Sequence, residues 1–439
     1  MLPAHYSLHF RVHTKVLLTL LLALFVVTAV SFAEPAHRRL LREATEAAKA
    51  NDLANAIDKL EQAARFAPDY PRLHVNLARL YSAQSRPADA LRALRTLAGM
   101  GLVFAIEKDP AYESIRSHPE FAELVAAFAA NQKPVGPAAT DEAAWAITDV
   151  TGIIESVATH PTTLENFFGD VRNRCIWYRD TSGPSGVLKK LSVDTDRLDG
   201  VFALKFSADG RTLWASTSAL PQMAGFTDAD KGRAALVAYD YATRKLRATY
   251  PLPADGREHV LGDFALAADG TVYVTDSTTP AIWRLTPGAE ALERWIAYPW
   301  FVSLQGATLS TDGRHLYVAD YANGIWRIDP ATKEAVVLKA PAGSTLYGID
   351  GIYAAPGALI AVQNGVNPQR VLRIDLDAKG EASAVRVLAQ GHAALKDAAL
   401  GQIVNGRFHF VGDSGWELFG QPAAAPAPRT VTILSVPAE

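Results

Sequence analysis

A pattern of paired strands recurs six times between residue 151 and the C-terminus, and it constrains the fold more than any other feature of the chain. The three clearest copies begin at residues 202, 262 and 305. Each is an apolar segment that ends in Asp-Gly and is followed at once by a second, aromatic-rich strand. Asp-Gly suits a two-residue hairpin turn, because both central residues of that turn need positive φ. The pattern therefore predicts a series of β-hairpins.

The looser copies complete the series and indicate its architecture. They begin near residues 155, 350 and 401, and successive copies start roughly 42 to 63 residues apart. The widest gap holds an insertion around residues 221–233. Repeats of about 40 to 50 residues with several strands each are typical of β-propellers. We therefore expect residues 145–439 to form a six-bladed β-propeller.

The preceding part of the chain has a helical period, so the fold class expected for the whole is multidomain, α plus all-β. Between residues 35 and 130, small and apolar residues recur 34 positions apart. Three pairs show this spacing: Ala44 with Ala78, Ala56 with Ala90, and Leu60 with Leu94. Thirty-four residues is the tetratricopeptide period, in which small residues allow two helices to cross closely. The sequence predicts two such repeats and a closing helical segment at residues 110–128, followed by a linker at residues 131–144.

The first 33 residues have the layout of a secretory signal peptide. Two basic residues, Arg11 and Lys15, precede an apolar run at residues 16–30, and small residues follow at positions 31 and 33. The run is short for a membrane span, although a retained anchor is the alternative. We expect cleavage after Ala33, export to the periplasm or outside the cell, and no membrane association afterwards.

Composition and missing motifs exclude several classes of function. The net charge is −3, with no long basic run, so nothing favours nucleic-acid binding. The single cysteine, Cys175, cannot form an internal disulfide, and its strand-like neighbours indicate a buried structural thiol. The sequence lacks a Gly-x-Ser-x-Gly elbow, a His-Glu-x-x-His helix, a phosphate-binding loop and a Cys-x-x-Cys pair. Most cofactor enzymes and structural zinc sites are thereby set aside.

A propeller places the start of every innermost strand around one central channel, so the residues that begin the repeats form a ring. Alignment of the repeats brings Gly262, Gln305 and Asp350 into one column, with Glu155 at the head of the first repeat. Asp263 lies one position beyond the column. Two carboxylates and a carboxamide, from Glu155, Asp350 and Gln305, are oxygen ligands of the kind that Ca²⁺ and similar cations prefer. The alternatives are a hydrogen-bonded rim around a water-filled channel and, for Gln305, a structural turn.

These repeat heads resemble those of the senescence-marker-protein-30/gluconolactonase family of six-bladed propellers, which includes lactonases and related esterases. The resemblance implies a divalent metal held by Glu155 and Asp350, with Gln305 where the family has an asparagine. It also implies an Asn-Asp pair near the substrate, of which this chain keeps only Asp263, because Gly262 replaces the asparagine. The resemblance covers roughly residues 145–439 and does not extend to the helical repeats.

Further candidates lie close to the ring in the sequence. Asp263 and His259, which directly precedes blade three, are the candidate catalytic residues, His259 as a general base over the channel mouth. The alternative for His259 is a surface or capping role. Gln305 and Asn364 are the candidate ligand-binding residues. Asn364 belongs to a polar loop at residues 363–367, for which an ordinary turn is the simpler interpretation.

Two classes of function fit these observations. The first is an exported binding protein, in which the helical repeats bind a protein or peptide partner and the propeller channel binds a small molecule. The second is a metal-dependent lactonase or esterase, in which the cation polarises the carbonyl group of the substrate. The helical repeats have the alternative role of a stabilising cap. The ring differs from that of the family at Gln305 and Gly262, and this difference favours the binding protein.

Overall fold

The computed structural model describes residues 34–136, 144–179, 188–420 and 427–439. The predicted signal peptide lies outside the described residues. Within them, no helix is both long enough and apolar enough to cross a membrane.

Helices make up the N-terminal part of the described chain, as the 34-residue period predicts. They are α2 (Ala36–Lys49), α3 (Leu53–Phe66), α4 (Pro71–Ala83), α5 (Pro87–Gly99) and α6 (Pro119–Asn131), with 3-10 turns η1 (Ile106–Lys108) and η2 (Pro110–Ile115) before α6. A side-chain cap or a proline fixes most of the starts. Asp52 accepts a hydrogen bond from the backbone N–H of Asn55 at the start of α3, and α4, α5 and α6 each begin with proline, which suits the first helical turn.

The residues of the 34-residue repeat lie in the core of this helical array. Ala56, Ala78 and Ala90 are fully buried, and α2 packs on α3 as α4 packs on α5. Alanine at such positions lets the helix axes approach closely, which larger side chains would prevent. The tetratricopeptide interpretation is confirmed in this architecture.

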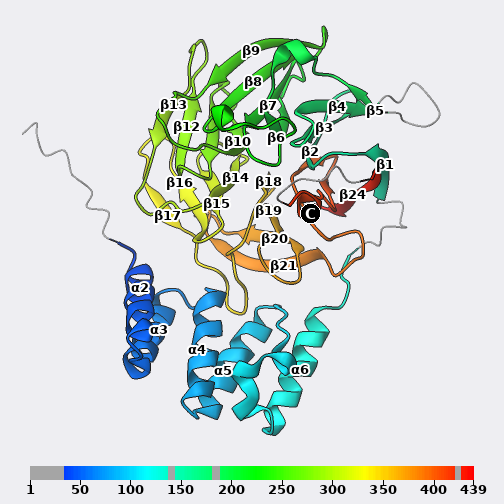
Figure 1. Ribbon diagram of the computed structural model, residues 1–439. Coiled ribbons are helices and arrows are strands. Elements are labelled where there is room, and N and C mark those ends of the chain that lie inside the picture. The colour runs from blue at the N-terminus through cyan, green and yellow to red at the C-terminus, as the bar shows by residue number, and fades with distance from the viewer. Residues whose placement is uncertain (1–33, 137–143, 180–187, 421–426) are drawn as a thin grey trace, which may run out of the picture. The chain divides into compact units, whose positions relative to one another are not determined.

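Six four-stranded antiparallel sheets follow one another around a ring (Figure 1). The strands of blades one to three are β2 (Ile154–Thr159), β3 (Asn166–Asp170), β4 (Cys175–Arg179) and β5 (Leu188–Lys190); β6 (Gly200–Phe206), β7 (Thr212–Ser218), β8 (Ala234–Asp240) and β9 (Lys245–Pro251); and β10 (Leu261–Leu266), β11 (Val272–Asp276), β12 (Ala281–Leu285) and β13 (Glu293–Ile296). Those of blades four to six are β14 (Leu304–Leu309), β15 (Leu316–Asp320), β16 (Gly324–Ile328) and β17 (Ala335–Val337); β18 (Ile352–Ala355), β19 (Ala358–Gln363), β20 (Arg370–Leu376) and β21 (Ala382–Gln390); and β22 (Gly401–Val404), β23 (Arg407–Val411), β24 (Arg429–Pro437) and β1 (Ala144–Val150). The prediction of six blades is confirmed.

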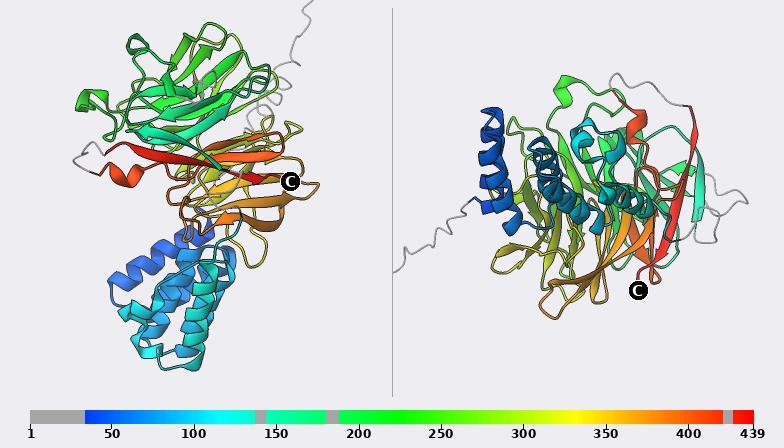
Figure 2. Two further views of the ribbon diagram at one scale, coloured as in Figure 1. Left: turned by 90° about the vertical axis from the view of Figure 1, so that its right-hand side faces the viewer. Right: turned by 90° about the horizontal axis from the view of Figure 1, so that it is seen from below.

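Blade six is built from both ends of the propeller sequence, which closes the ring. Its outermost strand is β1, which pairs with the terminal strand β24 through partners such as Trp145 and Ile433. Strand β24 is drawn in red in Figure 2. At the centre, the innermost strand of each blade contacts that of the next, including β22 with β2. Because the ring is closed in this way, each of the six blades packs against a blade on either side.

The turn prediction needs a correction. In the first Asp-Gly hairpin only Gly210 has positive φ, at 71°, whereas Asp209 accepts a hydrogen bond at 2.6 Å from the hydroxyl of Ser207 across a longer loop. Both central residues have positive φ in the Asn405-Gly406 turn, at 49° and 73°. Aspartate therefore serves these repeats as a side-chain acceptor that closes the loop, not as a residue of a two-residue turn.

In three of the blades, a buried aspartate at the end of the second strand links that strand to the third strand. It accepts a hydrogen bond from the indole N–H of a tryptophan on the third strand. The distances are 3.0 Å for Asp170 and Trp177, 3.4 Å for Asp276 and Trp283, and 3.2 Å for Asp320 and Trp326. All three carboxylates are fully buried, so the indole and nearby backbone donors replace their lost hydration. These aspartates are structural.

Candidate functional site

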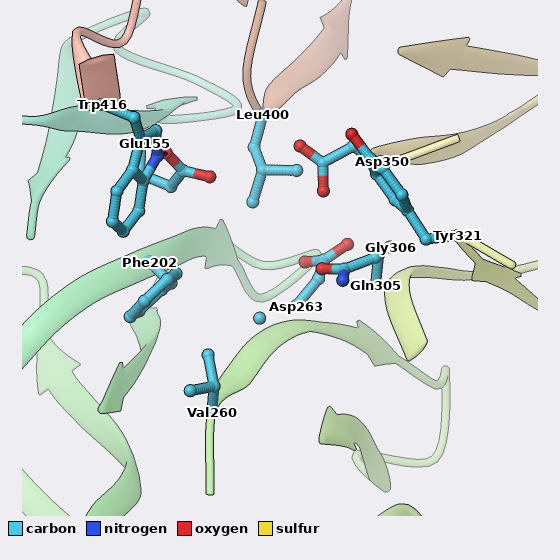
Figure 3. A pocket seen from close by; sticks show the side chains of 11 residues that line it. Glu155, Phe202, Val260, Asp263, Gln305, Gly306, Tyr321, Asp350, Leu400 and Trp416 are labelled. Carbon is cyan, nitrogen blue, oxygen red and sulfur yellow. Dashed lines mark hydrogen bonds between the residues drawn. The ribbon is translucent and has the colours of Figure 1, made fainter. Parts of the chain in front are cut away.

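A cavity of about 230 Å³ lies at the centre of the propeller (Figure 3). Four of the residues singled out from the sequence line it, from four different blades: Glu155, Asp263, Gln305 and Asp350. The remaining lining residues are Phe202, Val260, Gly262, Gly306, Tyr321, Leu400 and Trp416. The structure therefore brings the predicted ring together, within a wall that is otherwise largely apolar and aromatic.

Glu155, the second residue of β2, supplies one carboxyl group to the cavity. The side chain is 7% exposed, and its Oε2 accepts a hydrogen bond at 2.5 Å from the indole N–H of Trp416. Burial raises the pKa of Glu155 well above its ordinary value, and the nearby charge of Asp350 raises it further. The indole hydrogen bond opposes this rise only in part.

Asp350 supplies a second carboxyl group from the approach to β18. Asp350 is partly buried and lines the cavity. Its Oδ2 accepts a hydrogen bond at 2.8 Å from the amide of Asn364. Burial raises the pKa of Asp350 to about 7, with Asp263 and Asp397 adding repulsion. Glu155 and Asp350 point into the cavity from opposite sides (Figure 3).

Asn364, predicted as a ligand-binding residue, does not line the cavity and contacts Asp350 instead. Its amide nitrogen donates to Asp350 and, at 2.9 Å, to the carbonyl of Ala398. Its amide oxygen accepts a hydrogen bond from the hydroxyl of Tyr321. With both ends of the amide engaged, Asn364 fixes the orientation of the Asp350 carboxylate.

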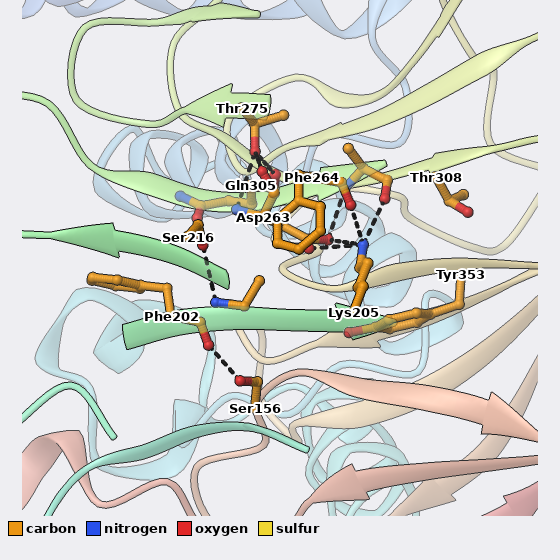
Figure 4. A network of polar contacts seen from close by, with 12 residues as sticks. Ser156, Phe202, Lys205, Ser216, Asp263, Phe264, Thr275, Gln305, Thr308 and Tyr353 are labelled. Atoms are coloured by element: carbon orange, nitrogen blue, oxygen red, sulfur yellow. Dashed lines mark hydrogen bonds and ion pairs between the residues drawn. The ribbon is translucent and has the colours of Figure 1, made fainter. Parts of the chain in front are cut away.

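Asp263 is already paired within the protein (Figure 4). Nζ of Lys205 lies 2.8 Å from Oδ1 as an ion pair and donates a hydrogen bond to Oδ2 at 3.0 Å, while the N–H of Ala307 donates to the same Oδ2 at 3.0 Å. No hydrogen bond of good geometry reaches Oδ1 in the described part of the chain. Burial raises the pKa of Asp263, and the Lys205 ammonium opposes that rise. A carboxylate held by its own counterion is a poor general base, so this geometry does not support the predicted catalytic role.

The structure does not place His259, the predicted general base, in the cavity wall. His259 is 2% exposed and does not line the cavity. Its Nδ1 lies 2.5 Å from Oδ2 of Asp276, and its Nε2 lies 3.0 Å from Oδ1 of Asp255. Burial alone would lower the pKa of His259, but the hydrogen bonds to these two carboxylates outweigh it and raise the pKa. His259 therefore belongs to the structural contacts around Asp276.

Gln305, the second residue of β14, presents its carbonyl oxygen to the cavity. Its amide nitrogen donates a hydrogen bond at 2.9 Å to the hydroxyl of Ser303, which leaves Oε1 on the side of Gly262. A Cβ atom added at Gly262 would lie 3.5 Å from that oxygen. The glycine thus keeps the wall open in front of the Gln305 carbonyl.

Three oxygens from three blades face the cavity without a hydrogen bond from any described residue: Oε1 of Glu155, Oε1 of Gln305 and Oδ1 of Asp350. In each side chain the other polar atom is anchored by the protein. Carboxylate and carbonyl oxygens form the donor set that hard divalent cations prefer, so these residues fit such an ion. In the described ranges, no three His, Cys, Asp or Glu side chains are grouped to hold a metal by themselves. The Gln305 carbonyl is thus the third oxygen that the cavity offers beside the two carboxyl groups.

Sequence reasoning missed Lys205, Tyr321 and Trp416. The signal for Lys205 is a single charged residue inside an otherwise apolar innermost strand. Tyr321 directly follows the strand-ending Asp320, but an aromatic residue in a turn is not specific. Trp416 lies in a 3-10 turn between β23 and β24 of blade six, where the sequence pattern carries no information about a contact with Glu155.

Comparisons with known proteins find one matching family and several similar solved structures. Residues 47–100 match the tetratricopeptide repeat family. Among solved structures, a gluconolactonase from Xanthomonas campestris aligns with a TM-score of 0.46 and 16% identity over 69% of this chain and 94% of that chain. A PQQ-bound aldose sugar dehydrogenase from Streptomyces coelicolor, at 0.43 and 16%, and a virginiamycin B lyase from Staphylococcus aureus, at 0.43 and 15%, each align over 66% of this chain and 98% of their own.

A search of curated proteins finds no match. The chain is thus similar to these three solved structures at low identity. At these identities and TM-scores the similarity carries no argument about activity.

Proposed function

We propose that this protein is a binding protein whose propeller cavity holds a divalent cation and, beside it, a small-molecule ligand. The observation that supports this proposal is the set of three unpaired oxygens from Glu155, Gln305 and Asp350 around one cavity. The two carboxyl groups repel each other in a buried site, and a bound cation would offset that repulsion. The aromatic and apolar walls suit the body of a small organic ligand.

A metal-dependent hydrolase is the alternative, and it fits the geometry less well. A cation held at these oxygens would polarise a substrate carbonyl. The hydrolysis of a lactone or ester also needs a group that takes a proton from the attacking water. Asp263 is paired with Lys205, and His259 is enclosed by Asp276 and Asp255, so neither is placed for that step.

We propose two further roles for the N-terminal part of the chain. The tetratricopeptide match and the helical packing support an array that binds a protein or peptide partner. The apolar run at residues 16–30 and the small residues before position 34 support export with a mature N-terminus at Glu34. Intact mass spectrometry of the protein recovered from the periplasm or culture medium tests the export proposal, and retention of Met1 would contradict it.

Thermal unfolding of the purified, metal-stripped protein tests the cation site. An ion that binds only the native state raises the melting temperature as its concentration increases. We expect millimolar Ca²⁺ or Mn²⁺ to do so, and we expect Glu155→Gln to remove the shift. The control is Asp228→Asn, which removes a carboxylate that is 89% exposed and far from the cavity residues in sequence, and which should keep the shift. A melting temperature that neither ion changes would contradict the cation site.

A further inference from the structure

The loop that follows β19 has two sides, and each side meets a different part of the protein. This connecting loop, residues 363–370, includes the end of β19 and the start of β20. On one side, Asn364 holds the Asp350 carboxylate of the cavity. On the other side, Val366, Asn367 and Arg370 contact the helical array. One short segment therefore serves both the cavity and the helices.

The contact with the helices has both polar and apolar components. The backbone N–H of Val103 donates a hydrogen bond at 2.7 Å to the carbonyl of Asn367, and Val366 packs against the core of the array. Next to the loop, the ring of Tyr347 stacks on that of Tyr70 with centroids 4.3 Å apart. Stacked aromatic pairs contribute beyond the area that they bury.

Arg370 depends on this contact for two of its hydrogen bonds. Its side chain is buried, and no carboxylate of the described residues pairs with it. Its Nε donates to Gln363 at 2.6 Å, and its Nη1 donates to the carbonyls of Met100 at 3.1 Å and Gly101 at 3.3 Å. These carbonyls follow the C-terminus of α5, where the helix dipole favours a cation. A buried guanidinium without a counterion depends on such acceptors, so the loop loses stabilisation if the array moves away.

The same loop reaches the cavity through Gln363 and Asn364. The amide of Gln363, which accepts from Arg370, donates to the carbonyls of Thr345 at 2.9 Å and Tyr347 at 2.7 Å. Asn364 is the next residue and orients Asp350, and the backbone N–H of Asp350 donates at 2.8 Å to the carbonyl of Val362. The helical carbonyls and the cavity carboxylate are thus joined by consecutive contacts in one loop.

We propose that the helical array sets the affinity of the cavity by holding the connecting loop, and that events at the array are transmitted to Asp350 through Arg370, Gln363 and Asn364. That the cavity binds a cation is taken from the proposed function, on which this part of the inference rests. Coupling of this kind is reciprocal, so occupancy of the cavity also strengthens the contact between the array and the loop. The array is then a regulatory element of the site, and a partner that displaces the array from the loop weakens binding in the cavity.

Two substitutions in the full mature chain test the coupling from opposite sides. Tyr70→Ala removes a ring on the helical side without changing the propeller, and Arg370→Leu removes the buried cation on the loop side. The control is Ile57→Val, which removes one methyl group from a buried residue of α3. Hydrogen–deuterium exchange is followed in the metal-stripped protein for peptides that span residues 346–366, and Mn²⁺ affinity is measured by calorimetry.

We expect both interface variants to speed exchange at the amides of Gly348, Asp350 and Gly365, and to weaken Mn²⁺ binding by about five-fold or more. The control should leave both measurements unchanged. If either folded variant exchanges like the wild type at these amides, the coupling is refuted whether or not Mn²⁺ binds. If the exchange responds as expected but the wild type does not bind Mn²⁺, the coupling stands and the proposed cation site fails. If Arg370→Leu does not fold, Tyr70→Ala alone decides.

Discussion

Glu155, Gln305 and Asp350 each have one polar atom fixed by the protein and one left facing the cavity. Trp416 fixes Glu155, Asn364 fixes Asp350, and Ser303 fixes Gln305. Such a division pre-organises the unpaired oxygens, because each side chain is held in one orientation before a ligand arrives. The cost is two carboxyl groups whose charges repel each other across the cavity, and this repulsion gives the site a measurable dependence on pH.

Asp350→Asn should stabilise the ion-free protein more at pH 8 than at pH 5. The pKa of Asp350 rises from 3.8 to about 7 on folding, so between these values the folded state binds more protons than the unfolded state. The free energy of unfolding therefore falls as the pH rises through this window and levels off above it. We expect the variant to gain about 2 kcal/mol relative to the wild type between pH 5 and 8. Urea unfolding in chelator measures this gain, which Asp228→Asn should not show.

Asp350→Asn should weaken Mn²⁺ binding much more than Gln305→Asn. The first change removes a charge from the ligand set, whereas the second keeps a carbonyl oxygen and only shortens the side chain. We expect losses on the order of 100-fold and less than about 10-fold, since each factor of ten corresponds to about 1.4 kcal/mol. Calorimetric titration of both variants gives the comparison. Equal affinities would show that Asp350 does not carry the charge of the site.

At the scale of the elements, the buried aspartates explain why the blades keep their shape. Asp320 accepts hydrogen bonds from the indole of Trp326 at 3.2 Å, the amide of Asn323 at 2.7 Å and three backbone N–H groups. We expect Asp320→Asn to lower the free energy of unfolding by about 2 to 4 kcal/mol, because an amide cannot accept all these bonds and leaves buried donors unpaired. Urea unfolding is the measurement. The exposed control Asp228→Asn should cost less than about 1 kcal/mol, and an equally small loss at Asp320 would contradict its structural role.

The sequence pattern was sufficient for elements whose signal is local. The innermost strands and the helices follow from periodicity, because the residues that define each element are neighbours in the chain. Strand β1 could not be predicted in this way, since its partner β24 is the last strand of the propeller. The same limit applies to the site. The ring of Glu155, Gln305 and Asp350 follows from the topology, whereas the pairing of Asp263 with Lys205 depends on side-chain directions that no local pattern encodes.

For the whole molecule, ring closure by β1 is the feature on which the propeller depends. Ile147 of β1 is buried between blades, whereas its neighbour Thr148 is exposed. We expect Ile147→Asp to cost more than about 3 kcal/mol, because it buries an unpaired charge at the closing sheet. Thr148→Asp on the opposite face should cost less than about 1 kcal/mol. Chemical unfolding of both variants tests the closure, and similar losses would contradict it.

The most direct test of the central claim is a crystal structure of the mature protein grown with Mn²⁺, with anomalous data collected near the manganese absorption edge. The account predicts an anomalous peak in the propeller cavity with Glu155, Gln305 and Asp350 as its protein ligands, at the distances of about 2 Å typical of oxygen ligands to small divalent cations. An empty cavity at saturating Mn²⁺, or a peak only at surface carboxylates, would contradict it.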